Sequence, residues 1–107
     1  MTVKQIGAIE LQARLQANEE IFLLDVREPD EFRYARIDNS VSIPLQQLPN
    51  RLAELHATDD IVVICHHGIR SQQAAQFLVH SGFGQVANLV GGIDAWSCLC
   101  DSSVRRY

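Results

Sequence analysis

The chain has 107 residues, enough for one domain and too few for two. Its hydrophobic content of 47% excludes a disordered chain, and its net charge of −4 argues against general nucleic-acid binding, which needs a basic face. No apolar window approaches the ~18 residues that span a membrane. The three cysteines lack the even number and the spacing of a disulfide framework, and the sequence shows no signal-peptide pattern. Both observations favour a reducing, cytoplasmic setting.

The first half of the chain alternates apolar runs with segments of helical spacing. It predicts, in order, an edge strand at 3–6, a helix at 8–17, a strand at 21–26, a short helix from Pro29, a strand at 41–43 and a helix at 45–55. Pro29 suits the first turn of a helix, where a backbone N–H is not needed. Four leucines at steps of three and four give the 45–55 helix one apolar stripe.

The second half continues the alternation. It predicts a strand at 61–64, a helix from Ser71 to Gly82, a strand at 86–89, a helix at 93–99 anchored in the core by Trp96, and a tail at 101–107 without a clear pattern. Ser71 is expected to cap the free N–H groups of its helix. The alternation predicts an α/β fold, with about five mainly parallel strands and helices on both faces of the sheet.

Cys65 lies between the 61–64 strand and the helix near Ser71. A continuous β-branched run is typical of a central strand, and ligands of open α/β sheets bind at the carboxyl ends of the strands. Residues 66–70 must curl around Cys65, and Gly68 supports this curl because it accepts a positive φ. Successive N–H groups in such a curl bind anions and stabilise a thiolate. The sequence therefore predicts an activated cysteine nucleophile.

The 65–71 segment, Cys-His-His-Gly-Ile-Arg-Ser, resembles the active-site loop of single-domain rhodaneses, a sulfurtransferase family. Further segments match family landmarks in the same order: Leu-Asp-Val-Arg-Glu-Pro at 24–29, Glu31-Phe32, Ile43-Pro44, and Asn-Leu-Val-Gly-Gly-Ile-Asp-Ala-Trp at 88–96. The resemblance covers residues 3–97 of a single domain at 3–107, with 98–107 as a C-terminal tail. It implies the three-layer rhodanese-like fold.

The resemblance also implies a reaction and its residues. The Cys65 thiolate attacks the outer sulfur of a small anionic donor such as thiosulfate, sulfite leaves, and cyanide or a thiol then takes the sulfur from the Cys65 persulfide. A sulfur-carrying protein is a compatible partner, and no metal or organic cofactor is required. The implied site comprises catalytic Cys65, the loop residues His66, His67, Gly68, Ile69, Arg70 and Ser71, and the supporting residues Asp25 and Arg27.

The sequence departs from the family pattern at 35–40, Ala-Arg-Ile-Asp-Asn-Ser. Two glycines of the family are missing there, and Arg36 stands in place of a histidine. We expect Asn39 to accept the left-handed conformation that the turn needs. The cysteine loop is complete, so the departure concerns only the neighbouring surface.

Several roles stay open at the level of sequence. Arg70 either contacts the donor or holds the loop by bonding Asp25 or nearby carbonyls. Asp25 is expected to be a structural acceptor rather than an acid or base. His66 and His67 are expected to point apart, one lining the pocket and one facing solvent, with no third ligand for a metal. Cys65 itself could instead be a buried structural thiol.

The roles of two further cysteines also stay open. Cys98 and Cys100 could hold a metal, form a strained disulfide or resolve the persulfide, but two thiols without other ligands favour no special role.

A dual-specificity phosphatase is one alternative function. Such an enzyme places five residues between Cys and Arg, whereas four separate Cys65 from Arg70. A rhodanese module for binding or regulation is the other alternative, and many such modules have lost the cysteine that is kept here.

Overall fold

Five parallel strands form one sheet in the computed structural model, which describes residues 2–107. The strands are β1 Lys4–Ile6, β2 Phe22–Asp25, β3 Val41–Ser42, β4 Ile61–Ile64 and β5 Val86–Leu89. Their order in the sheet is β1-β5-β4-β2-β3, and every pairing is parallel. The predicted α/β class is confirmed. The β-branched run of β4 lies at the centre of the sheet, where both of its faces are buried.

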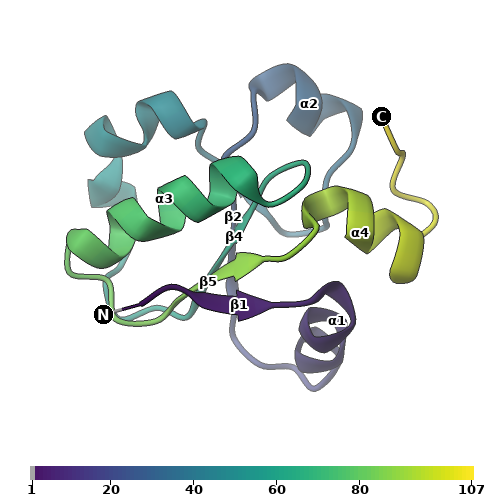
Figure 1. The fold of residues 1–107 in the computed structure, drawn as a ribbon, viewed down its shortest axis with the longest axis horizontal. Helices are drawn as coiled ribbons and strands as arrows, with labels where there is room; N and C mark the ends of the chain where they lie inside the picture. The colour runs from purple at the N-terminus through teal and green to yellow at the C-terminus, as the bar shows by residue number, and fades with distance from the viewer. Residues whose placement is uncertain (1) are drawn as a thin grey trace.

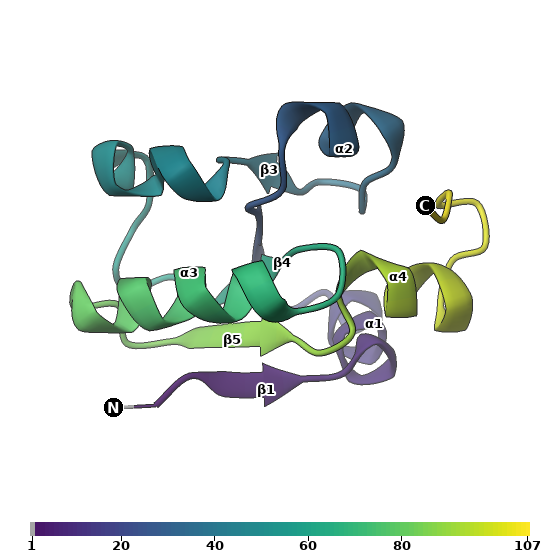
Figure 2. The same cartoon turned by 45° about the horizontal axis from the view of Figure 1, so that its top comes forward.

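Helices cover both faces of the sheet (Figures 1 and 2). They are α1 Ala8–Gln16, α2 Pro29–Tyr34, α3 Ile69–His80 and α4 Gly92–Leu99, with two short 3-10 helices, η1 Leu45–Asn50 and η2 Leu52–Glu54. One buried cluster packs α3 and the 3-10 segments against the sheet. A second cluster packs α1 and α4 against the opposite face. The predicted three-layer arrangement follows from these two clusters.

The predicted helix over 45–55 is wrong. The chain forms η1 and η2 there, and Pro49 lies inside η1. Proline has no N–H for an α-helical hydrogen bond and clashes with the carbonyl one turn earlier, so the α-helix cannot continue past this point. Leu48 and Leu55 are still buried against the core. The leucine stripe therefore predicted the packing correctly and the helix type incorrectly.

Three local expectations about the chain can be compared with the structure. Asn39 adopts a φ of 67°, as expected for the turn without glycine. Trp96 is buried in the cluster beneath α4, as expected for a core anchor. The 101–107 tail, which showed no sequence pattern, folds back onto the domain and buries Val104. Within residues 2–107, no helix combines the length and apolar character needed to cross a bilayer.

Candidate active site

Cys65 follows the carboxyl end of β4, at the edge of the sheet where all five parallel strands end. The loop to α3 begins with this residue, and the loop lies beside the start of α4 (Figure 1). Two backbone hydrogen bonds join the two segments: the Ile93 N–H donates to the Cys65 carbonyl at 2.8 Å, and the Asp94 N–H donates to the His66 carbonyl at 3.2 Å. The loop is therefore supported from below by β4 and from the side by α4.

The Cys65 sulfur is enclosed by polar groups of its own loop. The side chain is 1% exposed. Its Sγ accepts the Gly68 backbone N–H at 3.0 Å and lies 3.2 Å from the Ser71 hydroxyl. Ser71 also donates to the Oδ1 atom of Asn88, at the end region of β5. Gly68 has a φ of 103°, which confirms the expected left-handed curl.

Ser71 does not cap its helix, contrary to expectation. The helix begins at Ile69, with Gly68 as the preceding cap residue, and no side chain caps its end. The positive φ of Gly68 turns the chain tightly enough for the helix to start two residues earlier. This places Ser71 inside the first turn, where its hydroxyl faces Cys65 and Asn88.

The first turn of α3 presents free backbone donors. Within residues 2–107, the N–H groups of His67, Ile69 and Arg70 have no protein acceptor. Such donors at a helix N-terminus attract anions, and the helix dipole adds to the effect. Of the N–H groups in this loop, that of Gly68 donates to the sulfur, and the nest that the sequence predicts around the sulfur stays a prediction for the other three.

Arg70 is fully engaged by Glu31 of α2. Its Nη1 and Nη2 atoms donate to the two carboxylate oxygens at 2.7 and 2.9 Å. The guanidinium lowers the pKa of Glu31 to about 2, and the carboxylate raises the pKa of Arg70. The expectation that Arg70 would bond Asp25 is wrong, because Arg70 extends from α3 toward α2. The geometry favours Arg70 as an anchor of the loop.

Asp25 and Arg27 form a separate ion pair in the core. The Arg27 Nη2 atom lies 2.6 Å from the Asp25 carboxylate, and both side chains are 0% exposed. Asp25 also accepts the Arg27 backbone N–H at 3.1 Å, and Arg27 donates to the Ala35 carbonyl. Asp25 is thus a hydrogen-bond acceptor, as expected, but its partner is Arg27.

The two loop histidines stack rather than point apart. The His66 and His67 ring centroids are 4.0 Å apart with 26° between the planes. Successive side chains diverge on a regular strand, but the curl of the loop turns these two to the same side. His67 is exposed and His66 is half-buried, so the expected difference in exposure is found. A third ring, that of Tyr107, stacks on the other face of His66 at 4.0 Å and 8°.

Cys98 and Cys100 lie near the far end of α4 from the Cys65 loop. All three cysteines are free thiols, so no disulfide joins this pair. Cys98 is exposed, and partial burial raises the pKa of the Cys100 thiol. In the part of the chain that the structure describes, no three His, Cys, Asp or Glu side chains are grouped to hold a metal ion.

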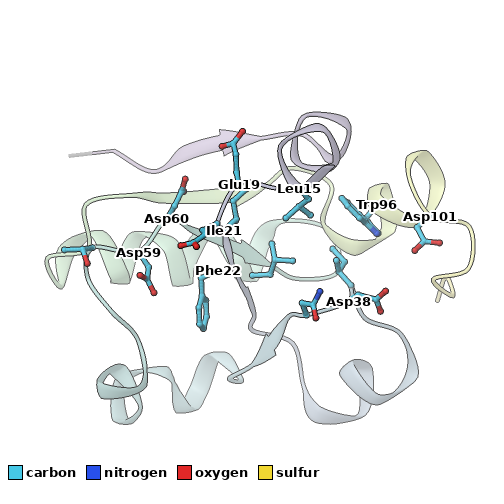
Figure 3. A pocket seen from close by; sticks show the side chains of 14 residues that line it. Leu15, Glu19, Ile21, Phe22, Asp38, Asp59, Asp60, Trp96 and Asp101 are labelled. Atoms are coloured by element: carbon cyan, nitrogen blue, oxygen red, sulfur yellow. The ribbon is translucent and has the colours of Figure 1, made fainter. Parts of the chain in front are cut away.

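A cavity of about 790 Å³ lies at the opposite edge of the sheet (Figure 3). It borders the start of β2 at Phe22 and the residue before β4, Asp60, whereas Cys65 follows the other end of β4. Several carboxylates line it, including Glu19, Asp38 and Asp59. The cavity is therefore separate from the cysteine loop, and its acidic lining does not suit an anionic ligand.

Three residues that the structure connects to the cysteine loop were not predicted to contact it from the sequence. Glu31 and Asn88 lay within matched segments, and Asn88 was a polar residue in a buried strand, which is a usable signal of a specific contact. Tyr107 lay in the unpatterned tail, and no sequence signal connected it to the loop.

The chain is an α/β domain in which a cysteine follows the end of the central strand and precedes the N-terminus of a helix. A family model described as "Rhodanese-like domain" matches residues 8–98. The chain belongs to the rhodanese-like domain family.

Relatives and solved structures agree with this assignment. A protein named "Sulfurtransferase" from Allochromatium vinosum is 37% identical over 89% of each chain. The "Thiosulfate sulfurtransferase GlpE" of Vibrio cholerae is 36% identical over 69% of this chain and 70% of its own length. The crystal structure of a rhodanese-like domain protein from Staphylococcus aureus superposes with a TM-score of 0.86 at 26% identity, covering 98% of this chain and 99% of that one.

Proposed function

We propose that the chain is a sulfurtransferase that carries a sulfane sulfur as a persulfide on Cys65. The observation that carries the proposal is the position of the Cys65 sulfur. It accepts the Gly68 N–H at 3.0 Å, and the loop that it begins leads into the start of α3, where the N–H groups of His67, Ile69 and Arg70 have no acceptor within the described chain. A sulfur atom there can hold negative charge both as a thiolate and as a persulfide.

In the first step, the Cys65 thiolate attacks the outer sulfur of a donor, with thiosulfate as the model compound. A bond forms between Sγ and the outer sulfur, and the sulfur–sulfur bond of thiosulfate breaks. Sulfite leaves with the bonding electron pair. The N–H groups of His67, Ile69 and Arg70 stabilise the anionic donor and the negative outer sulfur.

In the second step, a nucleophilic acceptor such as cyanide or a thiolate attacks the outer sulfur. The bond from Sγ to the outer sulfur breaks, and Cys65 takes the electron pair and becomes a thiolate again. Ser71 lies 3.2 Å from Sγ, and a rotation of its hydroxyl takes its one proton from Asn88 Oδ1 to the returning charge. The enzyme therefore ends the cycle in the state in which it began.

The backbone, rather than Arg70, supplies the attraction for the donor. Both guanidinium Nη atoms of Arg70 are bonded to Glu31, so its charge is already compensated. The same arrangement argues against a phosphatase, in which a free guanidinium would have to hold the phosphate. The printed names of the A. vinosum and V. cholerae relatives support sulfur transfer as the chemistry.

The test is intact-protein mass spectrometry after incubation with thiosulfate. Wild type should gain one sulfur atom, cyanide should remove it, and the Cys65→Ser and Cys65→Ala variants should gain none. Cys98→Ser is the matched control, because that thiol is exposed and distant from the loop. If neither thiosulfate nor glutathione persulfide loads the wild type, sulfur transfer is overturned and a binding module becomes the better reading.

A further inference from the structure

The 101–107 tail returns from the end of α4 to the active-site edge of the sheet (Figure 2). Val104 is buried, and its carbonyl accepts the hydroxyl of Ser97 in α4. Arg106 pairs with Asp94 near the start of α4, with 3.0 Å between Nε and Oδ1. These contacts bring the next residue, Tyr107, against the Cys65 loop.

Tyr107 joins three separate segments through one side chain. Its ring stacks on His66 of the loop at a centroid distance of 4.0 Å. Its hydroxyl accepts from the Nη1 atom of Arg27, after β2, and donates to Oε2 of Glu31 in α2, both at 2.8 Å. Burial raises the pKa of Tyr107 to about 12, so the hydroxyl keeps the proton that it donates. Because Glu31 also holds Arg70, Tyr107 braces both ends of the loop.

With Tyr107 stacked on His66, one buried polar atom of His66 lacks a partner within residues 2–107, and a cavity borders residues 101–105. The ring of His66 lies between His67 and Tyr107, and its Nε2 atom is buried with no hydrogen-bond partner in the described chain. Moving Tyr107 away would uncover one face of this ring, and a polar atom gains from contact with water. A cavity of about 300 Å³ lies between residues 101–105 and the end of α2 with the segment that follows it. Val104 and Arg106 hold the rest of the tail on α4, so Tyr107 can leave His66 without release of the whole tail.

We propose that Tyr107 is a specificity-determining residue, which covers the His66 side of the active-site loop and excludes bulky sulfur acceptors from Cys65 while small ones pass. The inference rests on the proposed function, because acceptor size matters only if Cys65 carries sulfur. Cys65 is 1% exposed, so every reagent must approach its sulfur past the loop that Tyr107 braces. A protein acceptor has to displace Tyr107 first, whereas cyanide or a small thiol does not.

The experiment compares two reagents with the same reactive group and different sizes: N-ethylmaleimide and a maleimide on a polyethylene glycol chain. Peptide mass spectrometry gives the labelling rate of Cys65, and exposed Cys98 serves as the internal reference. The variants are Tyr107→Ala, which removes the ring and hydroxyl, and Tyr107→Phe, which keeps the stack on His66. Tyr34→Phe is the matched control, because Tyr34 is a half-exposed tyrosine that touches Tyr107 only edge-on.

Tyr107→Ala should raise the rate of Cys65 labelling by the bulky maleimide about tenfold, with a much smaller change for N-ethylmaleimide. Tyr107→Phe should give an intermediate rise, and Tyr34→Phe none. No rise in the rate for the bulky maleimide, or the same fold-rise for both reagents, would overturn the proposal, the second because it reports general loosening of the loop. Labelling needs no sulfur donor. A failure of the proposed role of Tyr107 can therefore be distinguished from a failure of the proposed sulfur transfer, which the persulfide test measures.

Discussion

Arg70 and Glu31 form a two-point ion pair that fastens the start of α3 to α2, with N–O distances of 2.7 and 2.9 Å. The pair lies at the sheet edge that carries Cys65 and closes the loop that begins at this residue. Since the carboxylate compensates the guanidinium, the pair contributes rigidity to the loop more than positive potential. The contribution of the pair is therefore best measured as a free energy of unfolding.

The Arg70–Glu31 pair predicts a loss of stability in acid. The hydrogen bonds from Arg70 lower the pKa of Glu31 from 4.5 to about 2. A carboxyl whose folded pKa is depressed stabilises the fold above its unfolded pKa, and this contribution disappears as the pH falls from about 4.5 to about 2. Because the Arg70 side chain is 35% exposed, we expect about 1–2 kcal/mol after screening by solvent.

Urea unfolding of wild type and Glu31→Gln tests this expectation. Glutamine keeps an oxygen that can accept the Glu28 backbone N–H, so the start of α2 is retained. The difference in unfolding free energy should be present at pH 7 and much smaller at pH 2.5. A difference of the same size at both pH values would show that ionisation of Glu31 is not its source.

Gly92 should tolerate no side chain. A Cβ atom there would lie 2.4 Å from the carbonyl oxygens of Cys65 and His66, and φ is 59°. Both oxygens belong to the backbone of the loop and cannot move away alone, so Gly92→Ala should destabilise the fold by about 3 kcal/mol or more. Gly82→Ala has positive φ and open space, and should lose about 1 kcal/mol.

The third member of this series is Gly84→Ala, which has open space and no positive φ, and should change the unfolding free energy by less than about 0.5 kcal/mol. Chemical denaturation of the three variants separates steric conflict from backbone strain. If Gly92→Ala and Gly82→Ala lose equal stability, the contact with the loop carbonyls is unimportant.

The buried ion pair between Asp25 and Arg27 should be costly to break. Both side chains are 0% exposed, so Asp25→Asn leaves the Arg27 charge in the core with only neutral partners. We expect a loss of about 3–5 kcal/mol in unfolding free energy. Asp30→Asn is the control, because Asp30 pairs with Arg33 on the surface and should contribute less than about 1 kcal/mol. Similar losses in the two variants would contradict the buried role.

Ser71 should support the negative charge on Cys65. Its hydroxyl lies 3.2 Å from Sγ and is fully buried, so no water can replace it. We expect the hydroxyl to turn its one proton from Asn88 Oδ1 to the thiolate, so Ser71→Ala should slow N-ethylmaleimide labelling of Cys65 at neutral pH by about tenfold, the effect of one hydrogen bond to a charged group. Ser81→Ala, which removes an exposed hydroxyl, should leave the rate unchanged. Equal Cys65 labelling in both variants would assign Ser71 to packing alone.

The sheet and the position of the cysteine loop at its carboxyl edge could be predicted because their signals are local. The β-branched run of β4 and the turn chemistry of Gly68 each act within a few residues, and the alternation of strands and helices then predicts that the strands run mainly parallel. The leucine spacing before β4 was an equally local signal, but the missing N–H of Pro49 decided the helix type there.

The partners within the site could not be predicted in the same way. Arg70 could have paired with Asp25 or with Glu31, and only the packed position of α2 decides between them. The acidic character of Glu31 had a sufficient local explanation at the helix start, so no signal for a second role remained. The stack of Tyr107 on His66 depends on where the tail returns, which no periodicity records.

The hydrogen bonds from Ile93 and Asp94 to the carbonyls of Cys65 and His66 have a consequence for biosynthesis. The loop that holds the sulfur is bonded to a helix that emerges from the ribosome well after it. A nascent chain that ends before α4 has the cysteine but not the support that shapes its surroundings. We expect the thiol to become reactive only when the last helix docks, which protects an unfinished chain from sulfur chemistry.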